Sequence, residues 1–133
     1  MKRLLVVLLL LMLLLNLGVS CSTQSIATTG EQLFSAYINN EIKADMTYKD
    51  NAVKVTDRMI DIGRDGNGKA YLLLKTSYQS AQVCCYFSHK NEGDLSDIRY
   101  NALVSVVGKC QGLNWQGFVT VEDCQIDKVW STE

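Results

Sequence analysis

An uninterrupted apolar run at the start of the chain determines how much of it is available to form a domain. Leu4 to Leu15 contains only Leu, Val and Met, and it follows the basic pair Lys2-Arg3. A helix that spans a bilayer needs about 20 apolar residues, whereas a basic start, a shorter apolar run and small polar residues are the layout of an export signal. Removal of residues 1–20 from the 133 leaves 113 residues, enough for one small domain.

Cys21 sharpens the prediction for this segment. The sequence resembles a bacterial lipoprotein signal, in which a small residue precedes a cysteine that is acylated and becomes the new N-terminus. Ser20 and Val19 fit this pattern, and Gly18 departs from the usual leucine. The resemblance implies a lipid on Cys21, and more than one acyl chain is what makes anchoring stable. We expect residues 21–30 to be the lipid anchor and a polar tether, and residues 31–133 to be the domain.

Two alternatives to lipidation stay open, namely an uncleaved anchor helix that ends near Val19 and ordinary cleavage near Ser20. The segment Ser22-Thr23-Gln24-Ser25 lacks the acidic residues that retain many lipoproteins at the inner membrane. This favours the outer membrane of a bacterial envelope, with the domain facing the periplasm.

Charge bears on the class of ligand. Without residues 1–20 the chain has 11 basic and 14 acidic residues, a net charge of −3. Proteins that bind nucleic acid by neutralising phosphates are basic on at least one face. Nucleic acid is therefore an unfavoured partner, and an envelope protein or a glycan is favoured. The sequence gives no indication of the oligomeric state.

Local patterns predict one helix followed by five strands. Thr29 and Gln32 form a capping-box pattern, and apolar residues at helical spacing follow it as far as Ile42, which predicts a helix over 31–44. The two glycine turns of Asp65-Gly66-Asn67-Gly68 predict an antiparallel hairpin. The expected strands are 52–62, with a bulge near 56–58, then 70–76, 83–88, 102–108 and 118–126.

This order of elements, with a short helical turn expected between the third and fourth strands, matches a mainly β, five-stranded Greek-key barrel of the OB type that follows an N-terminal α-helix. Several short motifs carry a more specific likeness over residues 33–126. They are Tyr37, Asn40-Glu41, Ala44-Asp45, Tyr48-Lys49, Val53-Lys54-Val55-Thr56, Val83, Cys85, Phe87, the run 104–112, Val119, Val121, Cys124 and Ile126.

Through these residues the chain resembles the OB-fold lipoproteins of the tRNA_anti-like family. Asp57 and Asn101 depart from the pattern, since the family has glycine at both positions. Both residue types accept positive φ angles better than most. The family name reflects a likeness of fold and does not imply that tRNA is the ligand. Asp45 or Asn40 is expected to tie the end of the helix to the first strand.

OB barrels bind ligands on the outer face of their second and third strands, between two flanking loops. The residues expected there combine aromatic rings and cations, which can stack on a base or a sugar. They are Tyr71, Lys75 and Tyr86 on the strands, Arg64 and Lys69 on one loop, and Trp115 on the other. Tyrosines are also common on exposed sheets simply because they fit there.

The remaining cysteines are Cys84, Cys85, Cys110 and Cys124. An oxidising compartment permits disulfides, and a Cys85–Cys124 bridge is possible because the third and fifth strands of an OB barrel are neighbours. Cys110 is expected opposite Phe118, which leaves it poorly placed for Cys124. Four buried free thiols are the alternative. A zinc site is disfavoured because the sequence has no Cys-x-x-Cys pair and a single histidine.

No catalytic set stands out. His89 is the single histidine and lies in a polar segment, so we expect it at the surface. Asp57 and Asp61 could form a carboxylate pair but more simply face solvent. The sequence therefore predicts a lipid-anchored binding module without enzyme activity or cofactor, and the alternative is a structural or regulatory lipoprotein that docks on an envelope complex. A thiol enzyme or hydrolase would need Cys84, Cys85 or His89.

Overall fold

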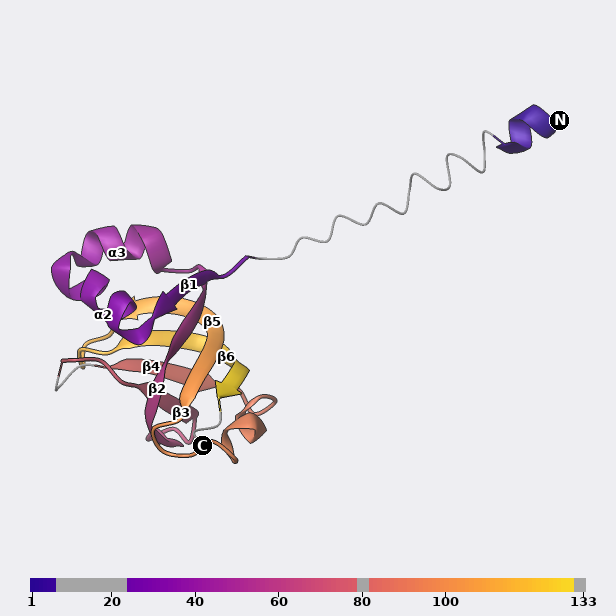
Figure 1. Ribbon diagram of the computed structural model, residues 1–133. Helices are drawn as coiled ribbons and strands as arrows, with labels where there is room; N and C mark the ends of the chain where they lie inside the picture. The colour runs from indigo at the N-terminus through magenta and orange to yellow at the C-terminus, as the bar shows by residue number, and fades with distance from the viewer. Residues whose placement is uncertain (7–23, 79–81, 131–133) are drawn as a thin grey trace.

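The computed structural model describes residues 1–6, 24–78 and 82–130, and Cys21 lies outside them (Figure 1). No helix among the described residues is both long and apolar enough to cross a bilayer. After the helical residues 2–6, the elements in chain order are β1 (Ile26–Thr29), α2 (Gly30–Asn39), α3 (Glu41–Tyr48), β2 (Ala52–Arg64), β3 (Ala70–Leu74), β4 (Val83–Phe87), the 3-10 helix η1 (Glu92–Leu95), β5 (Leu103–Leu113) and β6 (Val119–Trp130).

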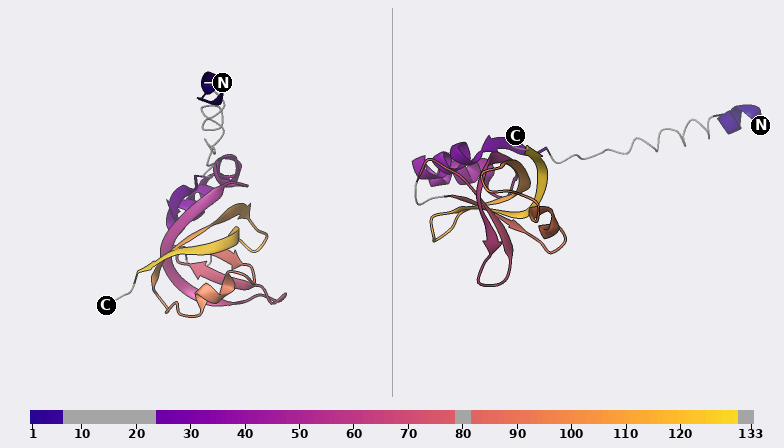
Figure 2. Two further views of the ribbon diagram at one scale, coloured as in Figure 1. Left: turned by 90° about the vertical axis from the view of Figure 1, so that its right-hand side faces the viewer. Right: turned by 60° about the horizontal axis from the view of Figure 1, so that its bottom comes forward.

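Strands β2 to β6 close into a barrel, which confirms the predicted fold class. Their order is β2-β3-β4-β6-β5, and a β2–β5 pairing joins the two ends. All these pairings are antiparallel except β4 with β6, which is parallel. Closure leaves no free edge among the five strands. Figure 2 shows the curled strands from two further directions, with the helices at one end of the barrel.

The expected tether contains a strand that the sequence reasoning missed. β1 pairs in parallel with β2, from Ile26 opposite Val53 to Thr29 opposite Thr56. The 13-residue β2 has room for this extra partner because β5 pairs with residues 52–58 along one edge, whereas β3 pairs only with residues 59–64 along the other. Four residues with no strong alternation gave little signal for a strand. The sheet therefore extends back to Ile26, ahead of the predicted start of the domain at residue 31.

The predicted single helix is two helices. The capping box is confirmed, because the Gln32 amide donates to Thr29 Oγ1 at 3.1 Å and the Thr29 amide donates to Gln32 Oε1 at 3.2 Å. At Asn40, however, the backbone is extended (φ −163°, ψ 94°) and Asn40 Oδ1 accepts from the Lys43 amide at 3.0 Å. Asn40 thus caps α3. The prediction that it ties the end of the helix to the first strand of the barrel is wrong for Asn40.

The helix break changes which apolar residues are buried. Leu33, Phe34 and Tyr37 of α2 close one end of the barrel and are at most 2% exposed. Ile38 and Ile42, expected on the same buried stripe, are 52% and 77% exposed. Ile42 lies beyond the new start at Asn40, so the break explains its exposure, whereas Ile38 belongs to the last turn of α2 and is exposed without any break before it.

The bend in β2 lies slightly later than predicted. The β2–β5 ladder is unbroken from Ala52 to Arg58, and the register shifts between Met59 and Asp61, where β2 exchanges β5 for β3. Asp57 pairs with Val104 in this ladder, and its carboxylate accepts from the Glu31 amide at the start of α2 at 3.4 Å. Asn101 has φ 65°, so it adopts the positive angle expected of the glycine that it replaces.

The inner faces of β3 and β4 form the centre of the core. Leu72, Leu74, Val83, Cys85 and Phe87 are at most 1% exposed, as the alternating pattern predicts. β5 is longer than the predicted 102–108, because three register shifts against β6 let it follow the barrel as far as Leu113. These shifts also move Cys110 opposite Val121, not opposite Phe118 as expected.

Candidate functional site

The outer face of β3, β4 and the adjoining strands carries two paired tyrosines. Tyr71 of β3 and Tyr86 of β4 lie directly opposite each other. Asp61 lies on β2, and Glu122 lies on β6 next to Val121, which pairs with Cys85. With Lys69 at the end of the β2–β3 hairpin, these residues make up what we call the tyrosine face. Three predicted site residues, Tyr71, Tyr86 and Lys69, are therefore brought together.

Tyr71 is held by a hydrogen bond from its hydroxyl and by the space that a glycine leaves for its ring. Its hydroxyl donates to Asp61 Oδ2 at 3.0 Å, which raises the pKa of Tyr71, because ionisation would lose that donor beside a carboxylate. The ring lies across Gly63, since a Cβ built there would be 2.8 Å from the Tyr71 hydroxyl oxygen. Glycine at position 63 therefore leaves the space in which the ring lies flat on the sheet.

Tyr86 is fixed by burial and by a thiol. Cys84, two residues earlier on the same face, is only 5% exposed. Partial burial, and then a hydrogen bond with Cys84, raise the pKa of Tyr86 to about 12. Burial raises the pKa of the Cys84 thiol to about 11. Both groups stay protonated at neutral pH, so this part of the face is uncharged.

Lys69 supplies the positive charge of the tyrosine face and contacts both an aromatic ring and a carboxylate. Its Nζ lies 5.2 Å from the centroid of the Tyr86 ring and forms an ion pair with Glu122. A cation at this distance is attracted to the face of an aromatic ring. Because Asp61 and Glu122 flank the two rings, the face has more carboxylates than cations.

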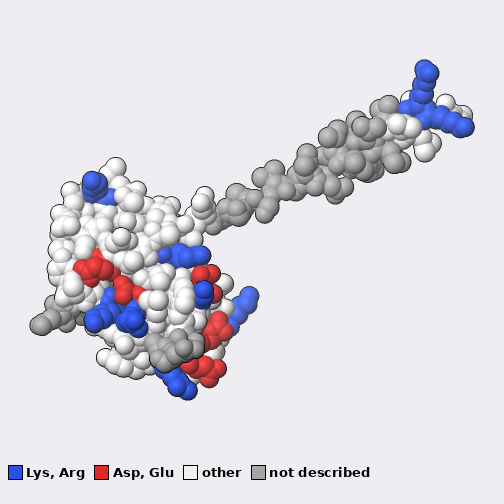
Figure 3. Space-filling view, viewed as in Figure 1, with Lys and Arg blue, Asp and Glu red and all other residues white. Residues whose placement is uncertain are grey.

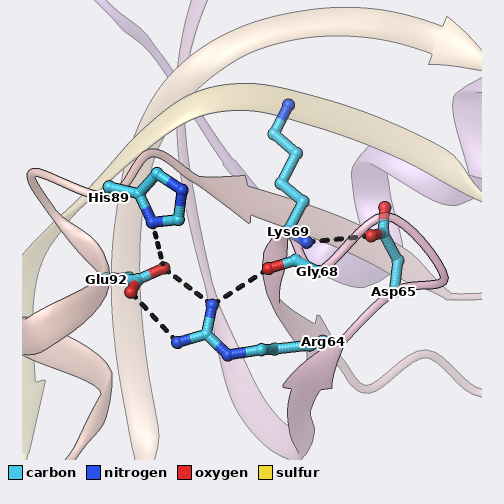
Figure 4. A network of polar contacts seen from close by, with 6 residues as sticks. All are labelled: Arg64, Asp65, Gly68, Lys69, His89 and Glu92. Carbon is cyan, nitrogen blue, oxygen red and sulfur yellow. Dashed lines mark hydrogen bonds and ion pairs between the residues drawn. The ribbon is translucent and has the colours of Figure 1, made fainter.

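The Arg64 side chain points toward Glu92 of η1 and the Gly68 carbonyl (Figure 4). Its Nη1 and Nη2 each donate to a different oxygen of Glu92 at 3.0 Å, and Nη1 also donates to the Gly68 carbonyl at 3.0 Å. His89 Nδ1 lies 3.4 Å from the same carboxylate. These bonds, that from Arg64 first, lower the pKa of Glu92. Arg64 is thus bound to Glu92 and Gly68, and its contribution to a ligand face stays a prediction.

The Glu92 carboxylate lies between two shallow hollows at this end of the barrel. One, of about 390 Å³, is lined by Ile62, Arg64 and Leu95 among others, and the second, of about 450 Å³, by Lys69, Phe87 and His89. His89 is 91% exposed in its side chain, in agreement with a surface position. The hairpin that carries Arg64 is itself fixed by Asp65, whose Oδ1 accepts from the Asn67 and Lys69 amides at 2.9 Å.

Lys75 and Trp115 lie at the opposite end of the two strands. Lys75 follows Leu74, which pairs with Val83, whereas the Arg64–Lys69 hairpin adjoins the Ala70–Phe87 pair. Trp115 lies in the β5–β6 turn, which meets the start of β4 through the Val119 amide and the Gln82 carbonyl. It is 91% exposed. A ligand that contacts all six predicted residues would have to extend along the full length of β3 and β4.

The four described cysteines are free and buried. Cys85 and Cys124 are neighbours, as the fold predicted, and a hydrogen bond between their thiols, together with complete burial, raises the pKa of Cys85 well above its ordinary value. The bridge that the sequence suggested is not formed here. Cys110 lies 3.6 Å from the Tyr37 hydroxyl inside the barrel.

Sequence reasoning missed Asp61, Cys84 and Glu122 as members of the tyrosine face. The signal for Asp61 and Cys84 was their parity with the tyrosines, but Glu122 depends on the β4–β6 register, which no local pattern reveals. Asp57 does not join Asp61, because its carboxylate accepts from the Glu31 amide at the start of α2. Among the described residues no three His, Cys, Asp or Glu side chains are grouped in a way that could hold a metal ion.

Comparison with known proteins agrees with this architecture. The sequence model of the tRNA_anti-like family matches residues 1–125. A similar fold is found in the crystal structure of a lipoprotein from Klebsiella pneumoniae subsp. pneumoniae MGH 78578, for which nucleic-acid binding has been suggested. The TM-score is 0.63 at 19% identity, over 77% of this chain and 92% of that one. Curated proteins give no match. Since the family match covers nearly the whole sequence, the chain belongs to the tRNA_anti-like family.

Proposed function

We propose that this protein is a lipid-anchored binding module of the bacterial cell envelope, with no catalytic activity of its own, and that its tyrosine face binds an envelope glycan or an envelope protein. The observation that carries this proposal is the pair Tyr71–Tyr86, flanked by Asp61, Glu122 and Lys69 on one outer surface of an OB barrel. OB folds bind their ligands on this surface.

The chemistry of the face favours hydroxyl-rich or peptide ligands. Aromatic rings offer apolar area at little entropic cost, because the Tyr71 and Tyr86 hydroxyls are already bonded to the protein. The carboxylates of Asp61 and Glu122 can accept hydrogen bonds from sugar hydroxyls or peptide amides. A ligand of either class needs both kinds of contact.

Nucleic acid is the second candidate, because it has been suggested for the Klebsiella lipoprotein of similar fold. The tyrosines could stack on bases. Against this, the carboxylates of the face would repel phosphates, and the chain without residues 1–20 has a net charge of −3. On the side shown in Figure 3, basic and acidic side chains lie next to one another and most of the surface is uncharged.

Anchoring through Cys21 is supported by the export-signal pattern before it and by the lipoprotein of similar fold. We propose that the anchor is in the outer membrane and that the domain faces the periplasm, because no acidic residue follows Cys21 directly. Intact mass of protein purified from bacterial membranes tests this. An acylated chain that starts at residue 21 is expected, and a Cys21→Ser variant should leave the membrane fraction.

The binding site is tested by amide NMR of residues 22–133 titrated with peptidoglycan fragments, pooled oligosaccharides, short single-stranded nucleic acids and an envelope protein extract. We expect shifts at Tyr71, Lys69, Tyr86 and Glu122 with the glycan or protein pools. Tyr71→Ala and Tyr86→Ala should abolish these shifts. Tyr100→Ala is the matched control, since Tyr100 is an exposed tyrosine (76%) outside this face.

Each result separates the candidates. Shifts with single-stranded nucleic acid alone would replace the proposed ligand class by nucleic acid. Shifts with the extract alone, at residues outside the tyrosine face, would support a structural or regulatory lipoprotein that docks on an envelope complex. If Tyr71→Ala and Tyr86→Ala fold normally and bind every ligand as the wild type does, the tyrosine face is not the site.

A further inference from the structure

We propose that the outer side of α3, with Ile42 and Met46, lies against the lipid surface in which the protein is anchored and thereby fixes the orientation of the barrel. This inference rests on the proposed acylation of Cys21. It concerns a surface that the candidate ligand face does not use, and it is carried by exposure, by position in the fold and by chain length.

The first observation is the exposure of large apolar side chains on a short helix. Ile42 and Met46 are one helical turn apart on α3 and are 77% and 83% exposed. Ile38 at the end of α2 is 52% exposed. On the inner side of α3, Ala44 is only 3% exposed, so the helix is already packed on the barrel through that side. Ile42 and Met46 therefore lie on a different side of α3, which the barrel does not cover.

The second observation is where this helix lies. α3 ends at Tyr48, and β2 begins at Ala52 after only three intervening residues. Ile26, the first residue of β1, pairs with Val53 at that same end of β2. The described chain thus enters the domain beside the helix pair, and Figures 1 and 2 show β1 and the helices together at one end of the molecule. The exposed side chains lie at the end of the barrel from which the anchor segment leaves.

The third observation is the length of the connection. Five residue steps separate Cys21 from Ile26, and a fully extended chain spans at most ~3.6 Å per residue, about 18 Å here. Ile26 cannot move toward the membrane without the barrel, because it belongs to the β1–β2 ladder. A lipid on Cys21 would hold this end of the domain within reach of the headgroups.

The polar groups around the apolar side suit a membrane interface. Glu41 and Lys43 flank Ile42, and Lys49, the residue after α3, forms an ion pair with Asp45. A lysine beside an apolar helix side can extend to the headgroups. A hollow of about 420 Å³ between α2 and α3 presents Asn39 and Lys43, whose side-chain N–H groups can hydrogen-bond to headgroup oxygens.

The experiment uses the full acylated chain in nanodiscs of phosphatidylethanolamine and phosphatidylglycerol that contain a gadolinium-chelating lipid. The Ile δ1 and Met ε methyl groups are observed by NMR. We expect the Ile42 and Met46 methyl signals to relax several-fold faster than that of Ile98, which follows η1 at the far end. In the double variant Ile42→Ser, Met46→Ser, the enhancement at Ile38 should fall several-fold, whereas Tyr100→Ser, which removes an exposed ring at the far end, should leave it unchanged.

The outcomes separate this inference from the anchoring on which it depends. If the intact mass of the protein shows no acyl chains, both the proposed anchoring and this inference are overturned. An acylated protein whose Ile42, Met46 and Ile98 methyl groups relax alike retains its anchor but has no preferred orientation, which overturns the inference alone. The same holds if the double variant keeps the full enhancement at Ile38, because a short tether without lipid contact would then explain the data.

Discussion

The two sides of β3 and β4 differ in what determines the surroundings of their side chains. Inward, Leu72, Leu74, Cys85 and Phe87 are at most 1% exposed and meet other apolar groups. Outward, the paired tyrosines lie on the same strands, but Tyr71 is fixed by Asp61 from β2. The inner side is specified by alternation within each strand, whereas the outer side depends on residues of neighbouring strands. The inner side should therefore govern stability and the outer side binding.

The largest effect is expected when two adjacent residues of β4, one from each side, are replaced by alanine in separate variants. Phe87→Ala removes a fully buried ring and should lower the free energy of unfolding by roughly 3–5 kcal/mol. Tyr86→Ala removes a partly buried ring and should cost less, about 1 kcal/mol. Urea denaturation of both variants measures the difference. Equal losses would mean that the outer ring is as much a part of the core as the inner one.

A methyl group added inside the barrel should have the next largest effect. A Cβ at Gly108 would lie 2.7 Å from Cys124 Sγ, from the Glu122 carbonyl oxygen and from Val121 Cγ1. Gly108→Ala is therefore expected to destabilise the domain by about 1–3 kcal/mol, a common range for overpacked cores. Gly66→Ala, which meets no atom within 4 Å in the hairpin turn, is the matched control. A neutral Gly108→Ala would show that β5 and β6 can separate locally.

On the outer side, a change of one hydroxyl should leave stability nearly intact but alter binding. Tyr71→Phe removes the hydrogen bond to Asp61 and should cost about 0.5–1 kcal/mol, the usual net worth of such a bond. The freed ring and carboxylate are no longer pre-oriented, so affinity for the ligand of the tyrosine face should fall. Thermal unfolding and the NMR titration are compared on one sample. A large loss of stability with unchanged binding would reverse the assigned roles.

The smallest effect is expected at the Arg64–Glu92 clasp, and it should depend on pH. The clasp lowers the pKa of Glu92 below 4.5, its ordinary value. Its contribution to stability is then complete above pH 4.5 and is lost as the pH falls through the lower pKa of the folded protein. Glu92→Gln should reduce the melting temperature slightly at pH 7 and not at pH 2. Asp97→Asn, an exposed carboxylate nearby, provides the control, and a pH-independent difference would exclude the clasp as the cause.

Features that depend on a local pattern could be predicted from the sequence, whereas features that depend on distant parts of the chain could not. The capping box at Thr29, the glycine hairpin and the inner residues of β4 were all evident from local patterns, and the family resemblance supplied the barrel. The break at Asn40 and the strand Ile26–Thr29 were not, because both depend on what the rest of the fold places beside them. The same is true of Glu122, which reaches Lys69 through strand register. Among the candidate residues, the sequence correctly grouped Tyr71, Tyr86 and Lys69 but could not foresee that Glu92 would hold Arg64.

The parallel pairing of β1 with β2 has a mechanical consequence. A pull on the chain ahead of Ile26, directed along β1, loads the ladder from Ile26 to Thr29 in shear, so its hydrogen bonds must break together and not one after another. Behind β1, the load passes to α2, whose Leu33, Phe34 and Tyr37 are seated in the barrel. The β1–β2 ladder thus joins the domain to the chain ahead of Ile26 in a way that resists tension.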